Sequence, residues 1–215
     1  MWVFVYCSDS QITNNGLNPT SDKRKMGLYK YIKKLWKQPK ANLGDLYKQK
    51  IIQWRKEPVT VRIEFPTRLD KARAIGYKAK QGYILVRQRV SRGSHKRPNI
   101  TGGRRSAHTS QKMVLHLSYQ TICEQRASKA YPNLEVLNSY FVAKDGQHYW
   151  YEIILVDRAH PVITNDPKIN WICEKRGRAF TGQTSSARKS RGLRHKGVGT
   201  EKVRPSANAN KGRIH

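Results

Sequence analysis

The sequence is poor in acidic residues. Only 14 of its 215 residues are Asp or Glu, against 43 Lys or Arg, so the formal net charge is +29. A chain with this field repels itself and attracts polyanions. Such an excess is tolerated when a phosphate backbone neutralises it and releases condensed counterions. The scarcity of acids therefore favours a nucleic-acid partner.

Cysteines and long apolar runs are also scarce. Cys7, Cys123 and Cys173 lie far apart and form no Cys-x-x-Cys pair, which argues against a disulfide framework and a structural zinc site. A reducing, cytoplasmic setting fits this usage. The apolar run at 2–7 is short and lacks a basic stretch before it, so it is a poor signal peptide. Without an apolar span of about 18 residues or a basic amphipathic helix of the membrane-surface kind, no membrane partner is expected.

Each possible catalytic motif in the sequence lacks a residue that its chemistry requires. Gly177–Thr184 has the glycine spacing of a phosphate-binding loop, but Gln183 stands where the lysine is required. Asp157 and His160 could pair as orienter and base, yet no nucleophile lies nearby in sequence, so a turn after a strand is the favoured interpretation. Cys123 is interpreted as a small core residue. We predict that the chain is not an enzyme, takes no small-molecule substrate and uses no cofactor or protein-bound metal.

Hydrophobic periodicity predicts helices at the start of the chain and strands after them. A helical period begins at Leu28 and ends at Gln38-Pro39, and a second helix is expected from an N-cap at Asn42 to just before Pro58. Alternation then predicts a strand over 59–65. Thr67 and Asp70 have the spacing of a capping box for a short helix.

The pattern of apolar residues predicts further strands in the second half of the chain. A strand is expected over 82–90, a helix from Ser118 to just before Pro132, and strands over 134–143 and 148–157 joined by an Asp-Gly hairpin. Tyr149, Trp150 and Tyr151 fall on the last strand, where core packing is favoured over base stacking. The fold class is therefore α+β, with N-terminal helices before a small, mainly antiparallel β-α-β-α-β-β core.

Charge is segregated along the chain. Residues 66–112 contain 13 Lys or Arg and one acid, whereas residues 131–173 contain three Lys or Arg, five acids and seven aromatic residues. This is the electrostatic footprint of a nucleic-acid binder. We predict a leader at 1–25 that is disordered or wrongly started, a core at 26–173 with a basic loop at 91–111, and a basic arm at 174–215 that becomes ordered on RNA.

The candidate RNA-binding residues are basic side chains in the segment before the second strand, on that strand's polar face, in the long loop and in the tail. The second strand is expected to have a dry side and a cationic side, and Gly82 is expected to let the backbone approach a phosphate. The candidates are Lys71, Arg73, Lys78, Lys80, Arg87, Arg89, Arg92, Lys96, Arg97, Arg104, Arg105, Arg188, Lys189, Arg191, Arg194 and Lys196.

Several segments resemble one known family, ribosomal protein fifteen of the large subunit of the archaeal and eukaryotic type. The matching segments are Met26–Tyr31, Pro66–Gly82, Val136–Tyr140, Tyr151–Asp157 and Ala187–Leu193. Trp171–Cys173 and Lys202–Ser206 are more similar to the archaeal branch. Residues 1–25 have no counterpart in the family, and 106–110 match poorly, so no RNA contacts are assigned there.

The resemblance implies a structural constituent of the large ribosomal subunit in the cytoplasm. Its expected partners are large-subunit rRNA and neighbouring ribosomal proteins, with no membrane partner and no homo-oligomer. The only metal expected nearby is the Mg²⁺ that accompanies rRNA. Two alternatives remain open. A packaging protein for RNA or DNA would also suit the charge, because phosphate contacts carry no base identity, and an RNA-modifying enzyme would require a constellation that the sequence does not display.

Overall fold

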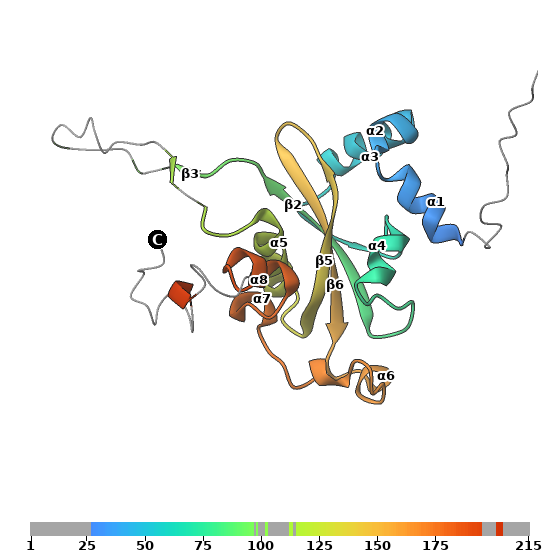
Figure 1. Cartoon of the computed structure of the whole chain (residues 1–215), viewed down its shortest axis with the longest axis vertical. Helices are drawn as coiled ribbons and strands as arrows, with labels where there is room; N and C mark the ends of the chain where they lie inside the picture. Colours follow the sequence, from blue (N-terminus) through green and yellow to red (C-terminus); the bar gives the residue numbers. More distant parts are fainter. Residues whose placement is uncertain are drawn as a thin grey trace, which may run out of the picture.

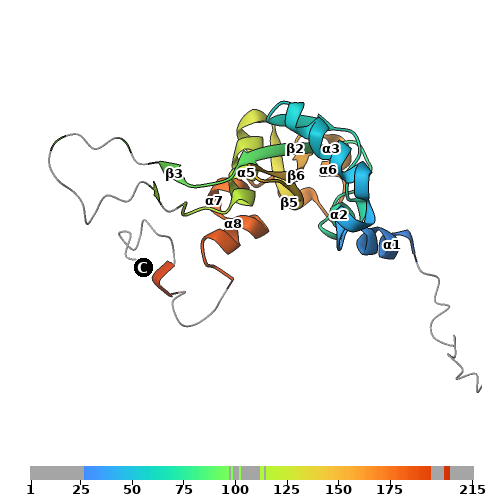
Figure 2. The same cartoon turned by 90° about the horizontal axis from the view of Figure 1, so that it is seen from above.

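The computed structural model describes residues 27–96, 98, 102, 112–113, 115–194 and 201–203. Its centre is a four-stranded antiparallel sheet with helices on both faces (Figures 1 and 2). This confirms the α+β class. In sheet order the strands are β1 (Thr60–Ile63), β2 (Tyr83–Ser91), β6 (His148–Asp157) and β5 (Leu134–Lys144). A separate two-stranded ladder, β3 (His95–Lys96) with β4 (Lys112–Met113), closes the base of the long basic loop.

Among the described residues, three helices precede the first strand, and the others lie between or after the strands. The N-terminal helices are α1 (Leu28–Leu35), α2 (Pro39–Asn42) and α3 (Gly44–Lys56), with α4 (Leu69–Ala74) before β2 and α5 (Tyr119–Ala130) before β5. After β6 come α6 (Pro161–Thr164), η1 (Asn170–Ile172), α7 (Arg178–Thr181), α8 (Ser185–Ser190) and η2 (Glu201–Val203). The predicted helix after Ser118 is confirmed, and the Ser118 hydroxyl caps it by accepting from Thr121 N at 3.3 Å.

The β5–β6 hairpin is the longest feature of the sheet, and its turn was predicted correctly. Asp145 Oδ1 accepts hydrogen bonds from Gln147 N at 2.7 Å and His148 N at 2.5 Å, which fixes the turn. The register shifts twice in β5, between Val136 and Asn138 and again between Phe141 and Ala143. Bulges of this kind bend a strand and add twist, and simple alternation does not predict them.

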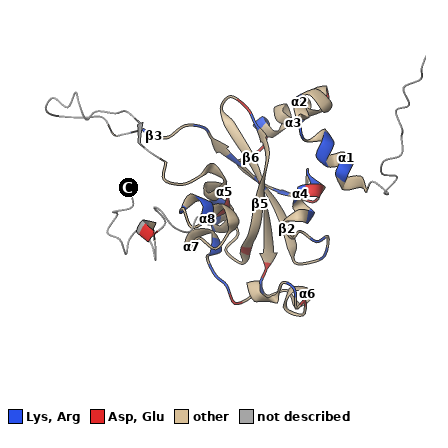
Figure 3. Cartoon of the chain, in the orientation of Figure 1, with Lys and Arg blue, Asp and Glu red and all other residues tan. Residues whose placement is uncertain are grey.

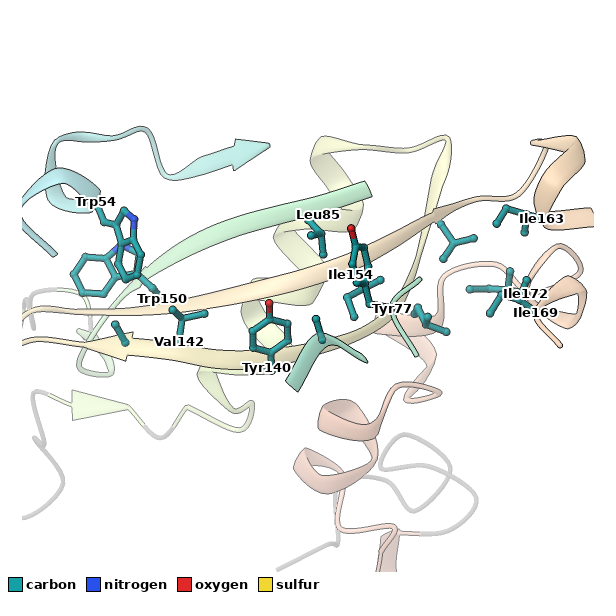
Figure 4. Close-up of a cluster of buried hydrophobic side chains, with 14 of the residues drawn as sticks. Trp54, Tyr77, Leu85, Tyr140, Val142, Trp150, Ile154, Ile163, Ile169 and Ile172 are labelled. Carbon is teal, nitrogen blue, oxygen red and sulfur yellow. The ribbon is translucent and has the colours of Figure 1, made fainter. Parts of the chain in front are cut away.

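One face of the sheet carries an aromatic core. It is covered by α3, α4 and the segment around α6 and η1. Trp150 of β6 is 1% exposed, and its ring centroid lies 6.2 Å from that of Trp54 on α3 (Figure 4). Side chains of this size supply several kcal/mol each when they are removed from water. This face therefore anchors the N-terminal helices to the hairpin.

The other face of the sheet is covered by α5 and α7. Val86 and Val90 of β2 and Ile153 of β6 pack there against Cys123 and Ala127 of α5. Both faces of the sheet are therefore covered. The prediction that one side of β2 is an exposed cationic surface is wrong. The side of β2 that carries Arg87 also carries Leu85, which is 2% exposed in the aromatic core.

Two predicted helix starts are wrong. Asn42 does not cap α3; its side-chain amide donates to the carbonyl oxygens of Lys34 at 3.1 Å and Leu35 at 3.0 Å, closing the end of α1. Thr67 does not cap α4, because its amide donates to Glu152 Oε2 at 3.0 Å and its hydroxyl to Glu152 Oε1. In both cases the side chain is directed at a group outside the helix that it was expected to cap, the end of α1 for Asn42 and the buried Glu152 carboxylate for Thr67.

The boundary predicted at residue 174 does not separate core from arm. Residues 174–194 fold back onto α5 and β5 (Figure 1), with Ala179 1% and Ala187 2% exposed. Glu135 accepts from Gly177 N at 2.9 Å and Arg178 N at 3.0 Å, and Glu124 accepts from Thr184 Oγ1 at 2.5 Å. The lack of large apolar residues in this segment led to the prediction of an arm. Small side chains and hydrogen bonds to buried carboxylates hold the segment on the core instead. The predicted leader lies outside the described residues.

Candidate nucleic-acid interface

The surface carries far more cations than its acids can neutralise. Pairing all 14 acidic residues one to one would still leave 29 Lys or Arg unmatched. Several acids are also withdrawn from the surface, since Glu124, Glu135 and Glu152 are each at most 3% exposed. Basic residues lie on α1 and on α8, at opposite sides of the sheet in the view of Figure 3. The described part of the chain therefore presents a largely unneutralised basic surface.

Four of the predicted residues are exposed on or next to ordered elements of the core. Lys71 and Arg73 lie on α4, Arg92 follows β2, and Lys96 belongs to β3. Arg92 Nη1 donates to the carbonyl oxygen of Asp145 at 2.9 Å, and its guanidinium lies 5.4 Å from the centre of the Tyr149 ring. These uncharged partners do not neutralise the Arg92 guanidinium, and they hold it in a defined position. Such a group suits a phosphate contact.

Another four predicted residues lie on or after α8. Ser186 and Ala187 face the core, so Arg188 and Lys189 on the same helix are exposed. Arg191 Nη1 donates to the carbonyl oxygen of Thr181 at 2.7 Å, and Arg194 Nη2 donates to that of Ser185 at 3.0 Å. The two later arginines thus brace α7 and α8 while still carrying charge.

Lys78 and Lys80 are paired with one acid. Asp166 Oδ2 lies 2.9 Å from Lys78 Nζ and 2.6 Å from Lys80 Nζ. These two ammonium groups hold the pKa of the Asp166 carboxyl well below its usual range. Gly82 serves packing here, because a Cβ on it would lie 2.6 Å from Ile163 Cγ1. Its expected approach to a phosphate is replaced by close contact with α6.

Arg87 and Arg89 do not form a cationic strand face. Arg87 is 9% exposed; its Nη2 lies 2.6 Å from Glu57 Oε2, and its guanidinium lies 4.7 Å from the centre of the Trp54 ring. Arg89 Nη1 donates to the carbonyl oxygen of Arg55 at 2.6 Å. Both side chains join β2 to α3, so their contribution to RNA binding stays a prediction with little free surface to support it.

Some exposed cations were not among the predicted RNA-binding residues. Four of the predicted residues lie outside the described part of the chain. Lys33 and Lys34 are exposed in the last turn of α1, and Arg126 is exposed on α5. Their signal was the helical spacing of single charges, which is weaker than a charge run. The predicted residues outside the described part are Arg97, Arg104, Arg105 and Lys196.

The incomplete catalytic patterns have structural explanations. His160 Nδ1 accepts from Val162 N at 3.2 Å and so caps α6, as expected of a turn after a strand. Burial raises the pKa of the Cys123 thiol to about 12, which fits a core residue. Gly177 and Gly182 flank α7, whose first amides are occupied by Glu135. Within the described ranges no group of three metal-ligating side chains forms a candidate site, and no helix is long and apolar enough to span a membrane.

These features define a class: a basic α+β protein that buries several of its acids and exposes most of its cations on a closed core. A family model described as Ribosomal L15 matches residues 27–210. The large ribosomal subunit protein eL15 of Nanoarchaeum equitans is 53% identical over 187 residues, covering 86% of this chain and 98% of that protein. The protein of the same name from Methanocella arvoryzae is 50% identical over 185 residues, covering 84% and 94%. The chain belongs to the ribosomal L15 family, which confirms the resemblance seen in the sequence.

Proposed function

We propose that this protein is a structural constituent of the large ribosomal subunit in the cytoplasm, where it binds and stabilises folded large-subunit rRNA. The names of the similar archaeal proteins support the subunit assignment. The observation that carries the rRNA-binding step is the exposure of Arg73 and Arg188, with other unneutralised cations, on elements anchored to the core. Cations held in fixed positions contact phosphates and set the register of a protein on RNA.

The buried acids strengthen this proposal. A carboxylate beside an exposed Arg would compete with phosphate, whereas Glu124, Glu135 and Glu152 are used inside the fold. Residues 174–194 are already folded, so their cations lose less conformational freedom on binding than those of a free arm. We expect phosphate contacts to dominate the affinity and to make it strongly dependent on salt.

Further partners follow from the same assignment. Neighbouring ribosomal proteins are expected, and the exposed apolar side chains Leu28 (63%) and Tyr31 (52%) on α1 support a protein contact. We expect no homo-oligomer, no small-molecule substrate and no catalytic activity. The only metal proposed near the interface is rRNA-associated Mg²⁺.

The test is the binding of the full chain to protein-free large-subunit rRNA at several salt concentrations. Replacing exposed Arg73 or Arg188 with Gln should weaken binding and lower the salt slope by about one in each case. Arg178→Gln is the matched control, because Arg178 is 6% exposed over the Trp171 ring and is not a predicted RNA-binding residue, so the slope should stay unchanged. Binding that is as tight to duplex DNA as to rRNA, with no co-sedimentation with large subunits, would instead favour the packaging alternative.

A further inference from the structure

A pocket of about 410 Å³ opens between the end of β2 and one side of α5. Val90 and Ile122 line its apolar part, together with Leu117 and the ring of Tyr119. The volume lies within the range of about 300–1,000 Å³ typical of small-molecule sites. An apolar lining of this size suits a planar ring system such as a nucleobase.

The wall of this pocket is fixed by Tyr119. Its hydroxyl accepts from Gly93 N at 2.8 Å and donates to Gly93 O at 2.9 Å, which ties the chain after β2 to the start of α5. Gly93 has φ +108°, a conformation that other residues rarely adopt. Arg92 N donates to Gln147 O at 2.8 Å, so the same turn is also tied to the β5–β6 hairpin. The pocket is therefore largely formed before any ligand arrives.

The rim of the pocket carries two cationic side chains, Arg92 and Arg126. Arg92, Arg126, His95 and His116 belong to the lining, which contains no Asp or Glu. Arg92 contacts only carbonyl oxygens and the Tyr149 ring among the described residues, and Arg126 is exposed on the solvent side of α5. A ligand with a flat apolar part and a negative group would match both the apolar lining and the two arginines at the rim.

We propose that this pocket holds a single nucleotide splayed out of the rRNA, with its base against Tyr119 and Ile122 and its phosphate at Arg92 and Arg126. The inference rests on the proposed function and adds a defined site to it. Unstacked bases are what proteins recognise on single-stranded RNA, and aromatic and Arg side chains are the usual contacts. A protein side chain with both properties would be less suited, because no common residue combines a large flat ring with a full negative charge.

The test uses the full chain bound to protein-free large-subunit rRNA from the same organism. After ultraviolet irradiation, cross-linked peptides are sequenced by mass spectrometry. We expect the tryptic peptide of residues 113–126 to carry one nucleotide, attached at Tyr119 or His116. In Arg126→Glu the corresponding tryptic peptide ends at Lys129, and its cross-link yield should be about tenfold lower, as expected for the loss of about 1.4 kcal/mol.

Lys129→Glu is the matched control, because it makes the same charge change on the same helix at an exposed position outside the pocket lining. It should reduce total rRNA affinity as Arg126→Glu does but keep the pocket cross-link. Arg92→Gln provides a second pocket variant, and Tyr119→Phe should reduce the cross-link by removing both hydrogen bonds to Gly93. Thermal unfolding verifies that each variant is folded.

The outcomes separate the pocket from the general function. If rRNA binds but cross-links fall elsewhere, or if Lys129→Glu loses the pocket cross-link as fully as Arg126→Glu, the pocket site is wrong and the rRNA-binding proposal stands. Cross-linking of the pocket to a neighbouring protein in intact subunits would also overturn it. If the wild-type chain does not bind rRNA at all, the proposed function itself fails.

Discussion

The two faces of the sheet are held by different interactions. One face buries large rings, with Trp54 and Trp150 each at most 4% exposed and Tyr140 at 5%. On the other face α5 joins the C-terminal helices through a hydroxyl and carboxylate network in which Glu124 accepts from Ser139 Oγ and Thr184 Oγ1. The first face gains stability mainly from the area removed from water. The second adds to its apolar packing the hydrogen bonds that satisfy the buried Glu124 carboxylate.

The difference explains how so basic a chain maintains a compact core. Three of its acids join segments distant in sequence: Glu152 binds residue 67, Glu135 binds 177–178 and Glu124 binds 184. Each junction fixes a segment that carries exposed cations. Buried carboxylates therefore organise the fold, while the charge that they cannot offset is left at the surface.

The aromatic face should be the most sensitive to substitution. Trp150→Ala is expected to lower the free energy of unfolding by about 3–5 kcal/mol, because it removes a fully buried ring packed on Trp54. Chemical denaturation measures this loss. Phe141→Ala on the same hairpin is the control, since Phe141 is 39% exposed and should cost much less. Equal losses in the two variants would contradict the contrast between the faces.

Glu152 is the polar centre of the aromatic face and should come next. It accepts from Thr67 N and from the hydroxyls of Thr67 and Tyr140, with Arg87 Nη1 at 4.0 Å. Glu152→Ala should cost about 3 kcal/mol, because several buried donors lose their acceptor. Glu152→Gln, which keeps one acceptor oxygen, should cost less in the same denaturation experiment. A neutral Glu152→Ala variant would mean that water or neighbouring groups replace the carboxylate.

The polar face can be tested at Thr184. Thr184→Val removes the hydroxyl that donates to Glu124 and caps α8 by accepting from Ala187 N at 3.3 Å. We expect a loss of about 1–2 kcal/mol and faster tryptic cleavage at Arg188 and Lys189 than in the wild type. Thr181→Val, on an exposed residue that donates to Gly177 O, should cleave at the wild-type rate. The polar network would lose its assigned role if both variants were cleaved alike.

The smallest effect is expected at the surface, where Asp166 pairs with Lys78 and Lys80. Hydrogen bonds from Lys80 and Lys78 lower the pKa of Asp166 in the folded state. The stability that this carboxylate contributes is therefore present above the unfolded pKa of about 4 and is lost as the pH falls below it. Asp166→Asn should flatten this part of the acid-denaturation curve. Asp45→Asn, which removes the highly exposed pair with Lys48, should leave the curve unchanged.

Local sequence signals predicted the elements that depend on local interactions. The helix after Ser118 and the hairpin around Asp145 form as predicted, because a cap and a tight turn are closed by residues within a few positions of each other. The signals at Asn42 and Thr67 failed, since their side chains bond the end of α1 and the buried Glu152 instead. No local pattern reveals such distant partners.

The candidate site shows the same division. The exposed positions of Lys71, Arg73, Arg188 and Lys189 agree with a surface role, and their contact with RNA stays a prediction. Arg87 lies in an equally basic pattern but is buried. Trp54 on α3 and Glu57, which follows α3, both contact its side chain. Charge along a strand does not indicate whether another element will cover it.

The sequence by itself determined the net charge, the α+β class, the family and the hairpin, because these depend on composition, short-range periodicity and matching motifs. Only the tertiary structure decided which cations are free, that residues 174–194 pack on the core, and that a pocket forms beside Tyr119. Those outcomes depend on which distant group satisfies each buried carboxylate and which element covers each face of the sheet. Such pairings arise from the whole fold, because a buried polar group must find its partner wherever the chain brings one.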